Sequence, residues 1–336
     1  MDRILALREK AKKNKKTIVL PEGEDKRVVR AASVIVSQGI ADVCLLGKKE
    51  EISKIATEES IPLEGVNLID PFVSRERDEI INTYYEVRKH KGLTPKDAEK
   101  VVMENFIYYA AVMTRIGMAD GFVAGASHTT SDVARAAIQC LKLVKEIGTV
   151  SSSFIMELAN CPFGENGLFI FADCGIIPCP SSRQLTGIAI AASDLLKKLF
   201  GIEPRVAMLS YSTKGSAKPD SVNVILEALK MVKKKRPALI IDGELQLDAA
   251  IVPEVAELKC PGSKVAGRAN VLIFPNLDSG NISYKLAQRL GNARAVGPII
   301  QGLNKPCSDL SRGCSWEDVV DTAAVTAIIA QERKGN

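Results

Sequence analysis

The sequence predicts an α/β protein with two domains, each a mostly parallel sheet flanked by helices. Short runs of β-branched residues alternate with helical patterns along the chain, which is typical of parallel βαβ units. The chain has 336 residues, of which 46% are hydrophobic and 25% are charged. Because a single core seldom grows to this length, we expect two domains that divide near residue 148.

The first half begins with a basic, amphipathic segment. We expect a surface helix there rather than a signal peptide, because the segment lacks a continuous apolar stretch. Runs rich in β-branched side chains predict strands, and segments with an apolar period near 3.6 residues predict helices. The expected strands are 17–20, 41–46, 66–69 and 121–124, and the expected helices are 26–38, 75–90 and 95–117.

The second half repeats the alternation, with strands expected at 167–172, 206–210, 238–241 and 271–274. Ser181 and Gln184 have the spacing of a capping box, so a helix should begin there, continue to Phe200 and stop at Gly201. A second helix should follow Asp220, since its apolar residues have the spacing of one buried stripe: Val222, Ile225, Leu226 and Leu229.

Composition excludes several classes of function. The 45 basic and 40 acidic residues leave a mild net charge of +5, and no aromatic residues are interleaved with the basic ones, so we do not expect nucleic-acid binding. A small anionic substrate fits the charge equally well. The apolar stretches are far shorter than the roughly 20 residues of a membrane span. The eight cysteines form no CxxC pair and only two histidines occur, which favours reduced thiols in the cytoplasm over a metal site.

The loop after the expected strand 121–124 has the pattern of an anion site. It contains Gly125, Ser127, Thr129 and Thr130, and a helical pattern follows directly. Backbone amides and the helix dipole at such a junction favour a phosphate group. Arg135, one turn into the helix, would add a bidentate donor. The alternative is that Thr129 only caps this helix, with Asp132 at the third helical position.

Two further residues have a functional and a plainer interpretation. His128 is a candidate general base, because the ordinary pKa of histidine is near 6.5, but a lone loop histidine is more often a hydrogen-bonding residue. Arg88 lies at the expected end of a helix, where a solvated cation is favourable without any ligand.

The segment 301–318 is the most unusual in the chain. Ser311 and Arg312 lie in a polar loop directly before a helix expected to run to about residue 330, and Asp318 lies in its first turn. A hydroxyl, a guanidinium and a carboxylate so close together make a plausible reaction centre. The plainer interpretation is that Ser315 and Asp318 form a capping box.

At this segment the chain resembles the phosphate acetyltransferase (phosphotransacetylase) family, and the likeness covers essentially the whole sequence. The motifs that carry it occur in the family's order: SYSTKGS at 210–216, DGELQ at 242–246, ANVLIFP at 269–275, GN at 280–281, QG at 301–302, KP at 305–306 and DLSRG at 309–313. The last motif resembles the acetyl enzymes more than their phosphate butyryltransferase relatives. Cys307 and Ser308 differ from the Val and Asn that the family usually has at these two positions.

The resemblance implies a two-domain fold like that of isocitrate and isopropylmalate dehydrogenases. The carboxyl-terminal segment would return to the first domain, giving domains 1–147 plus 297–336 and 148–296, with the active site in the cleft between them. It also implies a cytoplasmic homodimer that needs no metal and no cofactor. Acetyl-CoA, CoA, phosphate and acetyl phosphate would be its substrates, and neither nucleic acid nor a membrane would be a partner.

Carried over by motif, the resemblance assigns catalysis to Ser311, Arg312 and Asp318. It assigns binding of phosphate and CoA to Arg88 and Arg135, and we add Ser127, Thr129 and Thr130 from the loop pattern. We expect direct attack of the CoA thiol on the acetyl carbonyl in a ternary complex, with Asp318 as the base. The alternatives are a phosphate butyryltransferase-like acyltransferase and a non-catalytic domain that senses acetyl-CoA.

Overall fold

The computed structural model describes residues 2–217 and 220–331. The chain packs into two compact units, a first unit of Met1–Lys142 with Leu303–Asn336 and a second unit of Leu143–Gly302. The carboxyl-terminal segment is thus part of the first unit. The domain limits expected from the sequence, 147 and 297, stay a prediction about separately folding domains.

The first unit is built on a parallel sheet with the strand order β3-β2-β1-β4-β11. Its three central strands are almost wholly buried, as expected for parallel strands covered by helices on both faces. The predicted strands 17–20 and 121–124 are confirmed as β1 and β4. The strands are β1 (Thr17–Leu20), β2 (Asp42–Leu46), β3 (Asn67–Ile69), β4 (Gly121–Ala124) and β11 (Cys307–Asp309).

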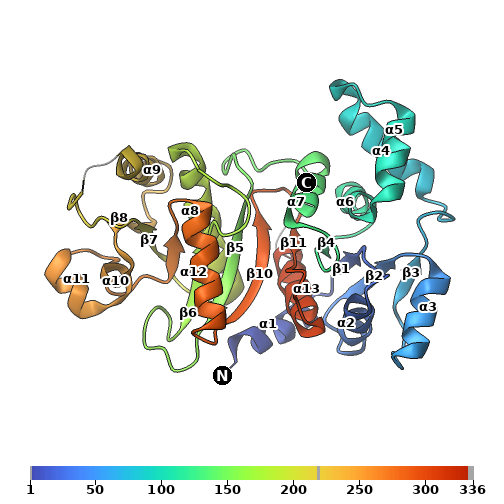
Figure 1. The fold of residues 1–336 in the computed structure, drawn as a ribbon, viewed down its shortest axis with the longest axis horizontal. Coiled ribbons are helices and arrows are strands. Elements are labelled where there is room, and N and C mark those ends of the chain that lie inside the picture. Colours follow the sequence, from blue (N-terminus) through green and yellow to red (C-terminus); the bar gives the residue numbers. More distant parts are fainter. Residues whose placement is uncertain (1, 218–219, 332–336) are drawn as a thin grey trace. The chain divides into compact units, whose positions relative to one another are not determined.

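Two groups of helices accompany this sheet, and part of the second group extends away from it (Figure 1). The first group is α1 (Arg3–Lys12), α2 (Lys26–Ser37) and α13 (Trp316–Gln331), in which α13 packs against the other two. The second group is α4 (Arg77–Arg88), α5 (Pro95–Glu104), α6 (Phe106–Ile116) and α7 (Thr130–Cys140). Helix α3 (Lys49–Glu58) and the short 3-10 helix η1 (Lys89–Lys91) complete the unit.

The prediction of one continuous helix at 95–117 is wrong, because the segment forms two helices, α5 and α6, that are separated at Asn105. The backbone of Asn105 is extended, and its side chain accepts a hydrogen bond from the backbone N–H of Ile107 (3.0 Å). Asparagine is a favoured N-cap, since its carbonyl satisfies an amide that the new helix leaves unpaired. Periodicity continues across such a break, so the apolar pattern alone does not show it.

The second unit has the strand order β10-β5-β6-β9-β7-β8. Strand β5 pairs antiparallel with both β10 and β6, and the remaining pairs are parallel. The sequence predicted counterparts of four of these strands but missed β5 and β10. The strands are β5 (Ser151–Glu157), β6 (Leu168–Ala172), β7 (Arg205–Leu209), β8 (Ile240–Leu245), β9 (Val271–Ile273) and β10 (Arg294–Gln301).

The helices of the second unit confirm the two that the sequence predicted there. Helix α8 (Ser182–Phe200) begins with the expected Ser181–Gln184 capping box and ends at Gly201, which adopts a left-handed backbone. Helix α9 (Asp220–Lys235) buries the predicted Val222, Ile225 and Leu229, while Leu226 of the predicted stripe is only partly buried. The others are α10 (Leu247–Ile251), α11 (Pro253–Lys259) and α12 (Leu277–Arg289).

An aromatic cluster holds α12 against the second sheet. Tyr284 stacks on Phe154 with ring centroids 4.1 Å apart, and Phe171 meets Phe274 edge-on at 5.3 Å. Such rings bury large apolar areas and add a geometric preference to the packing. In the described part of the chain, no helix has both the length and the apolar character to span a membrane.

Candidate functional site

Three loops of the first unit leave the carboxyl ends of neighbouring parallel strands. Strands β1, β4 and β11 lie side by side, with Val19 opposite Phe122 and Asp309 opposite Ala124. Loops that follow parallel strands emerge at one edge of the sheet, which is the common place for ligand sites in open α/β sheets. This edge therefore gathers 21–25, 125–129 and 310–315.

Glu22 fills the loop that the sequence predicted to hold an anion. Its buried carboxylate accepts the backbone N–H groups of Gly125 and Ala126 at Oε2 (both 2.9 Å) and those of Ser127 and His128 at Oε1 (3.0 and 3.2 Å). The expectation that these amides are unpaired is thus wrong, because an internal carboxylate from the next loop occupies them. Any phosphate at this junction must be held by other groups.

The His128 ring makes the fifth contact to this carboxylate. Its Nδ1 lies 2.8 Å from Glu22 Oε1. The hydrogen bond to Glu22 raises the pKa of His128 above its ordinary value, against the opposing effect of burial. Burial acts to raise the pKa of Glu22, but the bonds from His128 and the loop amides together lower it. The His128 side chain thus fastens the loop to Glu22 through a hydrogen bond, which matches the plainer of its two interpretations.

Thr130 joins the same loop to the end of β11. Its hydroxyl donates to Asp309 Oδ2 at 2.5 Å, and the other oxygen, Oδ1, is buried without a hydrogen-bond partner within residues 2–217 and 220–331. Burial raises the pKa of Asp309 to about 7. Gly125 is required beside it, because a Cβ on Gly125 would lie 2.2 Å from Asp309 Oδ1 and its φ is +114°.

Thr129 caps α7, as its alternative interpretation predicted. Its hydroxyl accepts the backbone N–H of Asp132 (3.2 Å), and the Asp132 carboxylate accepts the backbone N–H of Thr129 (3.4 Å). The backbone N–H groups of Thr130 and Ser131 donate to no acceptor in the described part of the protein. They are the donors that remain for an anion at this helix terminus.

Arg88 and Arg135, on α4 and α7, both act electrostatically on Tyr108 of α6. Burial raises the pKa of Tyr108, and the positive charges of Arg135 and Arg88 both act to lower it. Arg135 is exposed and contacts Asp132 (3.2 Å), one turn away on α7. Arg88, at the end of α4, has no ion pair within the described residues. The structure thus relates Arg88 and Arg135 through their common charge effect on Tyr108, and their role in binding stays a prediction.

Ser311 and Arg312 lie in an exposed loop between β11 and α13. The Ser311 hydroxyl accepts the backbone N–H of Gly313 (3.3 Å), and the Arg312 guanidinium has no ion pair in the described residues. A cation that is exposed and unpaired keeps its donors available for an anionic or developing oxyanion group. This loop is held by Arg27, whose side chain donates to the carbonyls of Arg312 and Cys314 (2.8 and 2.9 Å).

Asp318 forms the capping box that its sequence spacing suggested. Its Oδ2 accepts the backbone N–H of Ser315 (2.8 Å), while its own N–H donates to the Ser315 hydroxyl (3.2 Å). Its second oxygen, Oδ1, accepts no hydrogen bond from any residue that the structure describes. The cap therefore orients the carboxylate and still leaves one oxygen able to accept a proton.

The neighbouring Cys314 is a poor candidate nucleophile. Burial raises the pKa of its thiol to about 11, although Arg27 acts in the opposite direction. Little thiolate is present at neutral pH in such an environment. The predicted hydroxyl, guanidinium and carboxylate therefore stay the candidate catalytic groups of this segment.

Sequence reasoning missed four residues that build this edge of the sheet: Glu22, Asp25, Arg27 and Asp309. Glu22, Arg27 and Asp309 each act on a segment about one hundred residues or more away, so no local spacing reveals these contacts. Asp25 acts locally, on Arg27. The available signal was a group of acidic residues, Glu22, Glu24 and Asp25, directly after a buried strand. Polar residues in a loop that a rigid strand positions often have a functional role.

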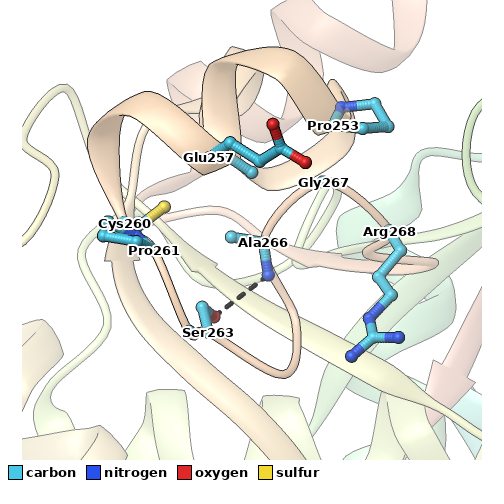
Figure 2. Close-up of a pocket in the computed structure, with 10 residues that line it drawn as sticks. Pro253, Glu257, Cys260, Pro261, Ser263, Ala266, Gly267 and Arg268 are labelled. Atoms are coloured by element: carbon cyan, nitrogen blue, oxygen red, sulfur yellow. Dashed lines mark hydrogen bonds between the residues drawn. The ribbon is translucent and has the colours of Figure 1, made fainter.

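A cavity of about 370 Å³ lies elsewhere, in the second unit between α11 and the loop that follows it (Figure 2). Figure 2 shows Ser263 beside Ala266, whose backbone N–H donates to the Ser263 hydroxyl (3.1 Å). None of the residues predicted from the sequence lines this cavity. The candidate site therefore stays at the edge of the first sheet, where the loops after β1, β4 and β11 emerge.

Known proteins resemble the chain along nearly its whole length. A phosphate acetyltransferase from Thermoanaerobacterium thermosaccharolyticum is 51% identical over 331 residues, covering 98% of this chain and 100% of the relative. The crystal structure of a phosphotransacetylase from Streptococcus pyogenes superposes with a TM-score of 0.91 at 42% identity and 98% coverage of both chains. A putative 4-hydroxythreonine-4-phosphate dehydrogenase from Salmonella typhimurium, 12% identical, covers 94% of this chain and 98% of its own with a TM-score of 0.54, which shows the dehydrogenase-like α/β fold alone.

The family described as Phosphate acetyl/butaryl transferase matches residues 3–327. The match includes both units and every loop of the candidate site. The resemblance inferred from the sequence motifs is thereby confirmed, and so is the predicted α/β fold class. The chain belongs to the Phosphate acetyl/butaryl transferase family of acyltransferase enzymes.

Proposed function

We propose that the chain is a phosphate acetyltransferase, which exchanges the acetyl group of acetyl-CoA with phosphate to give CoA and acetyl phosphate. The observation that carries the proposal is the β11–α13 segment, where an oriented carboxylate with one open oxygen follows an exposed hydroxyl and an unpaired guanidinium. The names and full-length similarity of the relatives support the same activity.

In the direction that consumes acetyl phosphate, the CoA thiol attacks the acetyl carbonyl carbon. The new C–S bond forms as the C–O bond to phosphate breaks, and the thiol proton passes to Asp318 and then to the leaving phosphate. A carboxylate is a weak base for a thiol, by about 4 to 5 pKa units. Proton transfer must therefore accompany bond formation, and Arg312 and Ser311 assist by stabilising the developing negative charge.

The phosphoryl group would be held by the α7 terminus and its nearby cations. The free amides of Thr130 and Ser131 and the Arg135 guanidinium suit a phosphate, with Arg88 as a second cation for phosphate or for the phosphates of CoA. The Ser127 hydroxyl donates to Glu24 (2.9 Å) and would have to release that acceptor to bind a phosphate. The capping role of Thr129 makes it a support for this terminus. Atoms and electrons balance without oxidation or reduction, so the reaction needs no redox cofactor. CoA takes part only as a substrate.

The experiment is turnover of acetyl phosphate and CoA by the purified wild-type protein, measured as acetyl-CoA formed, with butyryl phosphate in a parallel arm. We expect acetyl phosphate to be preferred. Faster turnover of butyryl phosphate would favour the phosphate butyryltransferase alternative. Tight binding of acetyl-CoA with no turnover of either ester would favour the sensor alternative.

Direct transfer in a ternary complex has its own test. Protein incubated with acetyl phosphate alone should keep its unmodified intact mass, because no acyl-enzyme forms. An added acetyl group on Ser311 or a cysteine that CoA then removes would overturn the direct mechanism.

The proposal also includes a cytoplasmic homodimer. Helix α12 exposes a stripe of one-turn spacing, in which Ile282, Leu286 and Leu290 are 57%, 51% and 82% exposed, and such an apolar face suits a second copy of the chain. All eight cysteines are free thiols, which supports a reducing compartment. Sedimentation of the wild type and of Leu286→Glu tests the dimer; a wild type that sediments as a monomer would contradict it.

A further inference from the structure

The Arg27 side chain, near the start of α2, connects the three loops of the candidate site. Its Nη1 donates to the carbonyls of Arg312 (2.8 Å) and Cys314 (2.9 Å), and its Nη2 donates to the carbonyl of Ala126 (2.8 Å). The remaining donors go to Asp25, from Nε (3.0 Å) and from Nη2 (2.6 Å). All five N–H donors of the guanidinium are therefore used.

Asp25 fixes the direction of this side chain. The same carboxylate caps α2 by accepting the backbone N–H of Arg27 (2.8 Å), so one residue starts the helix and orients the guanidinium. The hydrogen bonds that Arg27 donates to Asp25 raise the pKa of Arg27, so the cation stays charged. A bidentate pair of this kind holds a planar fork in one orientation, which a flexible ammonium does not reproduce.

The loop 311–314 depends on this contact. Within it, the N–H of Cys314 bonds to the carbonyl of Ser311 (2.9 Å) and the N–H of Gly313 bonds to the Ser311 hydroxyl. Among the described residues, every hydrogen bond from 311–314 to another segment goes to Arg27. Ser311, Arg312 and Gly313 are otherwise exposed.

We propose that Arg27 is a positioning residue that holds the Ser311–Arg312 loop against the β4–α7 loop in the geometry required for acyl transfer. This inference rests on the proposed function, since it assigns Arg27 the task of placing groups that act on the substrates. Arg27 is not itself a catalytic residue, because its donors are all committed to the protein. A loop free of this anchor would sample many orientations, and a misplacement of about 1 Å is enough to lower a rate by about 100-fold.

The test compares Arg27→Gln and Arg27→Lys with wild type, measuring kcat and the KM for acetyl phosphate and for CoA. Arg30→Gln is the matched control, because Arg30 lies on the same helix and contacts only Glu59 at the surface (3.3 Å) in the described residues. Hydrogen exchange of the amides in 311–315 is followed by mass spectrometry in the same four proteins.

For Arg27→Gln we expect a kcat at least about 30-fold lower, a KM for acetyl phosphate within about threefold of wild type, and exchange in 311–315 faster by about tenfold. Arg27→Lys should recover part of the lost kcat, because the ammonium still pairs with Asp25 and reaches a carbonyl. Arg30→Gln should match wild type in both measurements.

A kcat within threefold of wild type in Arg27→Gln, or faster exchange spread evenly over the whole chain, would overturn the inference. If Arg27→Gln does not fold, Arg27→Lys decides, since full kcat with unchanged loop exchange would also refute it. Failure of the proposed function is distinguishable, because then the wild type itself would form no acetyl-CoA.

Discussion

Replacing Glu22 by glutamine tests the internal carboxylate that fills the β4–α7 loop. The two side chains have nearly the same shape, so the change removes one acceptor oxygen and adds an NH₂ group without opening a cavity. In the wild type, Gly125 and Ala126 donate to one oxygen of Glu22, and Ser127 and His128 donate to the other. Whichever oxygen becomes NH₂, two backbone N–H groups face a donor instead of an acceptor.

The magnitude follows from those two amides. An unsatisfied buried donor costs about 1 to 3 kcal/mol, so Glu22→Gln should lower the free energy of unfolding by about 2 to 6 kcal/mol. That is a large part of the 5 to 15 kcal/mol that ordinary proteins have. Glu24→Gln is the control: Glu24 is exposed and accepts only the Ser127 hydroxyl (2.9 Å) among the described residues, so we expect a change within about 0.5 kcal/mol.

The assay is equilibrium urea unfolding followed by far-ultraviolet circular dichroism, with thermal unfolding as a second measure. A loss below 1 kcal/mol in Glu22→Gln, or equal losses in the two variants, would refute the assignment of Glu22 as the anion of this loop. A loss confined to Glu22→Gln would support it.

Three other predictions follow from the same contacts. Burial holds the pKa of Asp309 at about 7 in the folded protein, against 3.8 for the ordinary group, so wild-type stability relative to Asp309→Asn should fall as pH rises from 4 to 8. The fall should be on the order of 4 kcal/mol, and parallel stability curves would contradict it. The hydrogen bond to Glu22 raises the pKa of His128, so its stabilisation is complete below about pH 6.5 and is lost above the folded pKa. His128→Gln should therefore cost more free energy of unfolding at pH 5.5 than at pH 9, and an equal cost would count against the ion pair. Asn105→Ala should lower the free energy of unfolding by about 1 kcal/mol through loss of the α6 cap, and a neutral result in urea unfolding would disprove that role.

Elements with local signals could be predicted from the sequence. Helix α8 has a capping box at its start and a glycine at its end, and both act within a few residues of the chain. Strands β1 and β4 are short, apolar and bounded by polar or turn-forming residues. Such signals depend on backbone geometry near the residue itself, so tertiary contacts do little to change them.

The missed strands lack those signals. Strand β5 begins with three serines, which are weak strand formers, and β10 contains Gly297 and Pro298, which argue against a strand. The pairing of β10 with β5 shows a register shift between Val296 and Ile299, so the irregular residues lie where the ladder is interrupted. Strand β11 has only three residues and pairs in parallel with the distant β4. Long-range pairing determines all three.

Only part of the candidate site could be predicted from the sequence, for the same reason. The cap at Thr129 and the box at Asp318 are local, and both were recognised as alternatives to function. The role of Glu22 required knowing that β1 and β4 are neighbours, and the role of Arg27 required the return of β11 to the first unit. Sequence spacing gives the donors and acceptors, but topology decides which of them meet.

The most direct measurement of the central claim is the rate of acetyl-CoA formation from acetyl phosphate and CoA by wild type, Arg312→Ala and Asp318→Asn. Asparagine at 318 keeps an oxygen for the Ser315 N–H and so preserves the cap while removing the base. The account predicts an active wild type and a kcat lower by about 100-fold or more in each variant, with unchanged folding. Equal rates in all three proteins would contradict it.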